Sequence, residues 1–410
     1  MSKRIEKILD DFTTRYSKLG HKNDAIFESK KDAIITTFSK RLSRERIPLL
    51  EIARDKKNIE VEKINLKMQI KEDQELDYEK DLLCMHIALL DKAINERKSL
   101  YKNPKYPIEK NYARAPIISA YLPTRATLDK LRDSDGHIVQ NRPGFRNIIF
   151  ISEKNGTLLG PFDQKVFTAL QALWEIKGGH KTFSFTFYEL AELLEEPPEG
   201  GTYKLLRDSL WKIYQTELQM FGYHIGENEN RITTERHHLI QSMSDEIVQY
   251  KNDDKVIPKQ VTVVFNDYLH KGLSSGNISR INLSLHRDLS SDVSKVLYHL
   301  IASYSFDSSE NLLFYIDDII NHCNLNAPLD DYDEDSEEYK KKQSLQRKTN
   351  IKKLKKGLDE LSDFGVIFDY EMIKENGNKY ERVIVIPNPS VTRGNESLPN
   401  SRYQEIHPNW

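Results

Sequence analysis

The chain has 410 residues, of which 38% are hydrophobic and 30% are charged, and its formal net charge is −2. This length is sufficient for two or three domains. No stretch approaches the roughly 18 apolar residues that a membrane span needs, and charges interrupt the N-terminus before an apolar signal segment could form. We therefore expect a cytoplasmic protein with no membrane partner.

Residues 1–103 are rich in Lys, Glu, Ile and Leu, with Pro48 as their only proline and Gly20 as their only glycine. This composition predicts helices. The run Ile64–Ile70 alternates apolar and polar residues as a strand would, but its Met, Gln and Lys residues favour a helix. The region either pairs with a second copy, giving a homodimer, or caps the rest of its own chain, and the sequence leaves both open.

Residues 104–145 contain five prolines. Proline restricts itself and the residue before it, and it interrupts regular elements. We therefore predict a linker that becomes the edge of the next domain. Residues 146–152 then have the composition of a strand, and the Asn155-Gly156 pair after them is a hairpin-turn signal.

A first module is predicted over residues 146–258. Its periodicity indicates a helix at 161–177, a strand at 182–187, a short helix at 188–194, a third helix from Thr202, and a hairpin formed by 220–225 and 239–243. This is the element order of a winged helix, whose third helix enters the major groove while the hairpin wing contacts the DNA backbone.

A second module is predicted over residues 259–388, where the same order recurs without residue-by-residue similarity. It comprises a helix from Ser290, a strand at 312–316, a short helix at 317–323, a long helix at 338–364, and a hairpin of 366–370 and 382–386. Residues 389–410 are predicted to form a flexible tail. The expected fold class is α+β and mainly helical, with two tandem winged-helix domains after an N-terminal helical region.

The strongest local signal is the segment Lys340–Gly357, which has nine Lys and Arg residues and no acid. Its apolar residues Leu345, Ile351 and Leu354 predict a buried seam with the cations on the other faces. Such a helix binds phosphates in a salt-sensitive way, although a solvated charged helix has the same pattern. The predicted DNA contacts are Lys342, Gln343, Gln346, Arg347, Lys348, Asn350, Lys352, Lys353, Lys355 and Lys356.

The third helix of the first module is less basic, and its importance comes from its position in the winged-helix order. Its predicted DNA contacts are Lys204, Arg207, Lys212 and Gln215. Arg231 and Arg236 are expected in the wing or beside it.

Catalytic and metal-binding patterns are missing from the sequence. There is no G-x-x-x-x-G-K-[ST], G-x-S-x-G or H-E-x-x-H motif. Cys84 and Cys323 lie far apart, which argues against a disulfide framework and a cysteine zinc site. The acidic run Asp330–Glu338 lacks the spacing of a calcium loop. We expect no catalytic residue, no metal and no cofactor.

Several stretches resemble plasmid replication initiators of the replication initiator protein A type. They are Gly160-Pro161-Phe162-Asp163, Phe183-Ser184-Phe185, residues 201–210, Ser279-Arg280-Ile281-Asn282-Leu283 and residues 296–301. The resemblance covers about residues 145–390 and excludes the first hundred. The chain departs from the family at Trp211-Lys212-Ile213, where an Arg-Leu type continuation is expected.

The resemblance implies a protein without an active site that binds repeated sites in origin DNA and helps to open the duplex. It also implies recruitment of the host replication initiator and helicase, with monomers initiating and dimers repressing. Two alternatives remain open because fold does not fix function. One is a transcriptional regulator that binds an isolated palindrome, and the other is a protein-interaction or assembly module that works through the N-terminal helices.

Overall fold

The chain folds as two units, Met1–Lys102 (unit 1) and Asn103–Trp410 (unit 2). The computed structural model describes residues 3–18, 25–69, 74–102, 106–115, 117–121, 138–141, 148–151, 158–219, 223–224, 230–231, 236–248, 257–305, 311–327, 329, 335–375, 379–392 and 403–405. No helix in these segments combines the length and the apolarity of a membrane span.

Unit 1 consists of helices, as its composition predicts. They are α1 (Lys3–Ser17), α2 (Ala25–Leu42), α3 (Ile47–Met68) and α4 (Gln74–Ser99), followed by a 3-10 turn at Leu100–Lys102. The alternating run that also fits a strand is helical through Met68. Ile64 in that run faces the interior, and helix propensity together with this packing overrides the period of two.

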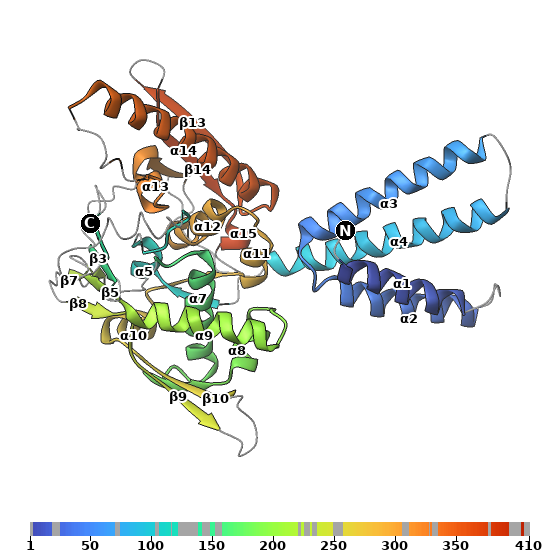
Figure 1. The fold of residues 1–410 in the computed structure, drawn as a ribbon, viewed down its shortest axis with the longest axis horizontal. Helices are drawn as coiled ribbons and strands as arrows, with labels where there is room; N and C mark the ends of the chain where they lie inside the picture. Colours follow the sequence, from blue (N-terminus) through green and yellow to red (C-terminus); the bar gives the residue numbers. More distant parts are fainter. Residues whose placement is uncertain are drawn as a thin grey trace. The chain divides into compact units, whose positions relative to one another are not determined.

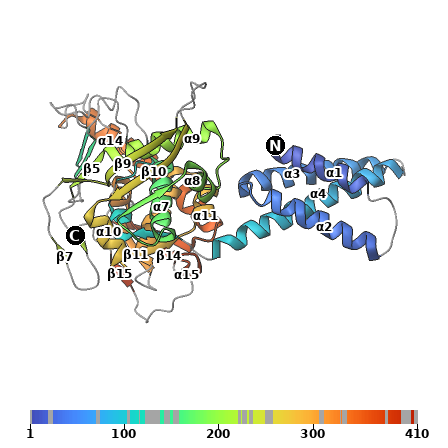
Figure 2. The same cartoon turned by 90° about the horizontal axis from the view of Figure 1, so that it is seen from below.

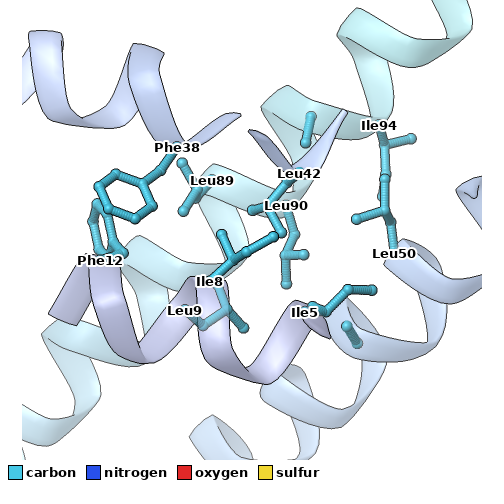
Figure 3. Packing of buried hydrophobic residues seen from close by; sticks show 12 residues of the cluster. Ile5, Ile8, Leu9, Phe12, Phe38, Leu42, Leu50, Leu89, Leu90 and Ile94 are labelled. Atoms are coloured by element: carbon cyan, nitrogen blue, oxygen red, sulfur yellow. The ribbon is translucent and has the colours of Figure 1, made fainter. Parts of the chain in front are cut away.

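The core of unit 1 forms where the four helices meet (Figure 3). Ile5 and Phe12 of α1, Phe38 of α2, Leu50 of α3 and Leu90 of α4 are fully buried in it. The rings of Phe12 and Phe38 pack edge to face with their centroids 5.6 Å apart, a favourable geometry for aromatic pairs. Unit 1 therefore has an apolar core of its own.

Unit 2 contains two sets of elements that follow the same order along the chain. The first set starts at α7, which is labelled in Figures 1 and 2. Module 1 comprises α7 (Pro161–Ile176), β4 (Thr182–Phe185), α8 (Phe187–Leu193), α9 (Gly200–Gln215), β9 (Ile240–Val248) and β10 (Ile257–Phe265). Pro161 starts α7, where Asp163 accepts a hydrogen bond from the Gly160 N–H at 2.8 Å. The sheet order is β4-β10-β9, so the last strand lies in the middle.

The same arrangement occurs again further along the chain. Module 2 comprises α12 (Asp292–Ser305), β12 (Asn311–Tyr315), α13 (Ile316–His322), α14 (Glu337–Asp363), β13 (Ile367–Glu375) and β14 (Lys379–Pro387). Its strands follow the order β13-β14-β12, so here too the last strand lies between the other two and pairs antiparallel with both. Element order and strand pairing therefore repeat together.

The hairpin predicted within residues 220–243 is not the wing of module 1. Strands β5 (Thr216–Gln219) and β8 (Arg236–His238) pair with each other in a separate sheet with β2 (Ile138–Asn141) and β3 (Ile148–Ile151). The hairpin that joins β4 is β9–β10, and the predicted domain boundary at 258/259 falls inside β10. The charged segment between these two strands has the composition of a linker, which explains the error.

Part of the predicted linker 104–145 is an integral piece of unit 2. Strand β1 (Tyr106–Glu109) pairs antiparallel with β11 (Ile278–Ile281), and α5 (Lys110–Arg114) follows it. Arg114 donates a hydrogen bond to the Ser303 carbonyl and lies over the Tyr304 ring. The prolines do not prevent this, because β1 is an edge strand, where a missing N–H is tolerated.

Two segments of the predicted flexible tail 389–410 form regular elements. Helix α15 (Pro389–Thr392) follows β14 directly, and β15 (Tyr403–Glu405) pairs in parallel with β12. The other residues after 392 and the predicted turn at Asn155-Gly156 lie outside the described residues.

Glu109 is the buried polar centre of the β1 segment. Its carboxylate accepts hydrogen bonds from the Tyr112 N–H at 3.0 Å and from the side chains of Asn111 and Asn277, each at 2.7 Å. Burial nevertheless raises the pKa of Glu109 to about 7, because desolvation outweighs these three donors. Gly272 of α10 (Asp267–Ser274) packs directly on this carboxyl group.

We expect Gly272→Ala to destabilise unit 2 by about 1–3 kcal/mol, the usual cost of overpacking. A Cβ at this position would lie 2.6 Å from Glu109 Oε1, and the carboxyl group cannot move without losing its donors. Gly201→Ala is the matched control, because a Cβ there meets nothing within 4 Å and alanine favours a helix by up to about 1 kcal/mol. Urea unfolding measures both variants, and equal midpoints would contradict the close packing.

Two histidines form a second buried polar group, between α11 (Leu283–Asp288) and α12. The ring centroids of His286 and His299 are 5.1 Å apart. Among the described residues, neither ring nitrogen of His286 and not the Nε2 of His299 has a hydrogen-bond partner. Burial lowers the pKa of His299 to about 3 and holds the pKa of His286 well below its usual value.

Candidate nucleic-acid interface

Helix α9 occupies the third-helix position of module 1. Leu206, Leu210 and Ile213 face inward and are buried, because their spacing of three and four residues follows one side of a helix. Lys204 and Arg207 lie on the opposite side and are exposed. The structure therefore presents these two predicted DNA contacts to solvent together.

The other predicted contacts of α9 are less exposed. Lys212 and Gln215 are half-buried, and the Lys212 Nζ lies 3.5 Å from Asp163 Oδ2 at the start of α7. Trp211 is 36% exposed on the same side as Lys204, and it is not among the predicted DNA contacts. Its signal was its spacing of seven residues from Lys204, which places both on one face.

Arg231 and Arg236 do not lie in the wing. Arg231 belongs to β7 (Asn230–Arg231), which pairs with β6 (Tyr223–His224), and Arg236 begins β8. Neither strand belongs to the sheet of the β9–β10 hairpin, so the two arginines are not part of the wing strands, although β8 directly precedes β9. Their side chains lie outside the described residues.

Helix α14 occupies the third-helix position of module 2. Ser336 caps its N-terminus by accepting a hydrogen bond from the Tyr339 N–H at 3.1 Å. Leu354, Leu358 and Leu361 are fully buried. Gly357 lies between them, where a Cβ would come within 2.9 Å of Val293 Cγ1, so its missing side chain allows α14 to approach α12 closely.

The opposite face of α14 is cationic. Lys348, Lys352, Lys355 and Lys356 are all exposed there, and so are Lys341 and Lys342 closer to the N-terminus. Gln343 is exposed too, but it lies about three turns before Leu354 and therefore on the side of the seam. Leu345 is 61% exposed on this face, so its predicted place in the buried seam is wrong. The seam starts later, at Asn350, which is the first buried residue of α14.

Three of the predicted contacts in α14 hold module 2 together instead. Asn350 is buried and donates a hydrogen bond to Asn326 Oδ1 at 2.8 Å, so it is not available to base edges. Gln346 donates to the Ala327 carbonyl at 2.9 Å. Arg347 pairs with Asp317 of α13 at 2.7 Å and donates to the Tyr380 carbonyl of β14.

Lys353 differs from its neighbours, because its Nζ lies 5.5 Å from the centre of the Tyr121 ring. This cation–π contact holds it beside the segment that follows α5. Phe368, at the start of the β13–β14 hairpin, is 62% exposed and was not among the predicted residues.

The described residues contain no cluster of three or more His, Cys, Asp and Glu side chains that could hold a metal ion. Most of the acidic run Asp330–Glu338 lies outside them. Cys84 is exposed and Cys323 is buried, and neither forms a disulfide.

Comparisons with known proteins give one family match and similar solved structures. Residues 152–302 match the family described as "Initiator Replication protein, WH1". A solved structure of RctB domains 2 and 3, a selenomethionine derivative, aligns with 67% of this chain and 97% of its own at 13% identity and a TM-score of 0.41. A second structure of RctB domains 2–3 aligns with 69% of this chain and 98% of its own at 12% identity and a TM-score of 0.39.

No curated protein matches this sequence. The family match begins just before α7 and extends through most of α12, so it includes all of module 1 and the first helix of module 2. The predicted resemblance to replication initiators is thereby confirmed for residues 152–302, which match the WH1 domain of the initiator replication proteins.

Proposed function

We propose that this chain is a plasmid replication initiator that binds repeated origin sites on double-stranded DNA through two winged-helix domains. Modules 1 and 2 are these domains, and α9 and α14 are the helices that enter the major groove. The main support is α14, whose exposed lysine face lies opposite its buried seam, in the position of a reading helix.

The two helices have different chemistry and therefore different roles. The lysines of α14 act as point charges that neutralise phosphates and release counterions, which fixes the protein on the duplex without reading its sequence. Arg207 of α9 can bond a guanine through two parallel hydrogen bonds, and Lys204 lies one turn before it. Contacts from both helices offset the free energy that bending the DNA costs. The bend in turn assists opening of the duplex.

In this proposal the protein acts in the cytoplasm without chemical catalysis and without a cofactor. Opening of the duplex gives access to the host replication initiator and helicase, which the chain recruits as partners. Footprinting on DNA from the source should show protection of spaced direct repeats, and a plasmid without this gene should not replicate. Normal replication of that plasmid, or protection of a single promoter palindrome, would favour a transcriptional regulator instead.

We expect Arg207→Ala to reduce the preference for specific over nonspecific DNA by about 5- to 150-fold, which corresponds to about 1–3 kcal/mol. Arg280→Ala is the control, because Arg280 pairs with Glu175 at 2.7 Å and lies outside α9 and α14. Competition binding with a single repeat and a scrambled duplex measures the ratio. An unchanged ratio would mean that α9 does not read bases through Arg207.

A further inference from the structure

Helix α3 has an apolar line on its exposed side. Ile52, Ile59 and Leu66 are 50%, 51% and 61% exposed and follow each other at intervals of seven residues. Because seven residues complete almost two helical turns, the three side chains lie in one row. The row faces away from Leu50, Ala53 and Ile64, which are buried against the rest of unit 1. Figure 1 shows α3 beside α4 along its length.

Charged residues border this apolar line, with one sign on each side. Asp55 and Glu62 are exposed on one flank, and Lys56 and Lys63 are exposed on the other. The rotation of 100° per residue produces this separation. We propose that the apolar line and its flanks form a self-association surface, on which the α3 helix of a second copy of this chain docks in parallel.

The charge pattern selects both the partner and its orientation. When two copies of α3 lie parallel about a two-fold axis, the acidic flank of each faces the lysine flank of the other. Asp55 precedes Lys56 by one residue, and Glu62 precedes Lys63 by one residue. The acid of one copy and the lysine of the other therefore differ by only about 1.5 Å in their position along the helix axis. In the antiparallel arrangement the acidic flank of one chain would face the acidic flank of the other, and the two lysine flanks would also face each other, so like charges would repel.

The extent of the apolar line sets the strength of this association. From Ile52 to Leu66 it covers about 21 Å of helix, which is short for a coiled coil and provides a small interface of the weak, transient class. The dimer therefore forms and dissociates with protein concentration. Unit 1 provides this surface by itself, so the inference does not depend on the proposed function.

Ile59→Glu is the first test, since Ile59 is at the centre of the line and its exposure lets the variant fold. We expect sedimentation velocity to show self-association of the full chain that weakens at least about tenfold in the variant, because a charge replaces an isoleucine that the dimer would bury. Ile176→Glu is the matched control, as Ile176 is 61% exposed on α7 in unit 2. A chain that stays monomeric, or two variants that weaken equally, would overturn the proposal.

Cysteine crosslinking tests the orientation. In a background with Cys84→Ser, Ile52→Cys should form a disulfide with its own copy under mild oxidation, because parallel helices bring position 52 of one copy beside position 52 of the other. Antiparallel helices would crosslink Ile52→Cys only to Leu66→Cys when the two variants are mixed, and that outcome would overturn the parallel arrangement.

Charge reversal tests the flanks. Asp55→Lys with Glu62→Lys makes both flanks basic, and Lys56→Glu with Lys63→Glu makes both acidic. Each variant should fail to self-associate, and an equal mixture of the two should associate at least as well as the natural chain. Undiminished self-association of either variant alone would show that the flanks do not guide docking. Binding to a single DNA repeat should remain unchanged throughout, which separates this test from that of the proposed function.

Discussion

Replacing Lys348, Lys352, Lys355 and Lys356 together by Gln should lower the affinity for DNA by about 10²- to 10³-fold at physiological salt. All four lysines are exposed on α14, and each phosphate that a lysine neutralises contributes about 0.9 to the slope of log affinity against log salt. The slope should therefore become less steep by about 3 to 4. Glutamine keeps a long polar side chain and a similar helix propensity, so the loss mainly reports the charge.

The matched control removes four lysines from unit 1. Lys3, Lys7, Lys30 and Lys40 are exposed on α1 and α2, and their replacement by Gln changes the net charge by the same amount. Fluorescence anisotropy with one duplex over a range of salt concentrations measures both variants. Equal losses would mean that overall charge governs binding, and the assignment of α14 as the gripping helix would then be wrong.

Acid should destabilise unit 2 through its buried histidine pair. The pKa of His299 is lowered to about 3, so the unfolded chain takes up a proton near pH 6.5 while the folded chain does not. The stability that the neutral ring contributes is present above pH 6.5 and is lost as pH falls toward 3. At about 1.4 kcal/mol per pH unit once the unfolded histidine is protonated, His299 alone reduces the free energy of unfolding by about 2–3 kcal/mol between pH 6.5 and 4.5. His286, whose pKa is also lowered, adds to this loss.

The variant that tests this is His286→Leu with His299→Leu. Removing unpaired polar atoms from a buried site costs little, so the variant should match the natural chain near pH 7 and exceed its stability at pH 4.5. Glu109 has the opposite effect, because its raised pKa of about 7 gives stability that is full below pH 4.5 and lost as pH rises. Since both proteins contain Glu109, its effect cancels in the comparison.

Tryptophan fluorescence during urea unfolding reports on unit 2, because Trp174, Trp211 and Trp410 all belong to it. The difference in the free energy of unfolding between variant and natural chain should increase steadily as pH decreases. Parallel pH profiles would show that the buried pair does not control acid stability.

The elements of both modules follow from local sequence patterns. Helix α7, the strand at 182–185 and the long helix α14 are visible in the sequence because apolar residues recur with the helical or strand period. The sequence did not reveal which strands share a sheet, because this depends on pairing between residues that lie far apart in the chain. Strand β5 looks like the start of the wing, and only its pairing with β3 shows that it belongs to another sheet.

Part of the candidate site was also predictable from the sequence. Composition identified the lysines of α14 correctly as exposed cations, because a run of lysines cannot be buried without partners. Composition could not distinguish Asn350, whose amide is enclosed beside Asn326, from an asparagine that faces solvent. The role of Glu109 was invisible for the same reason, since two of the groups that surround it, Asn277 and Gly272, lie more than 160 residues later in the chain.

The pairing of β1 with β11 has a consequence for the order of events during synthesis. Tyr106–Glu109 leave the ribosome roughly 170 residues before Ile278–Ile281, their partners in the sheet, which at 5–20 residues per second is a delay of about 10–30 s. Unit 1 has all of its helices and its own core by then and can fold at once. The apolar side of β1, including Ile108, meanwhile has no partner strand, so nascent chains stalled between residues 110 and 278 expose a segment that chaperones bind.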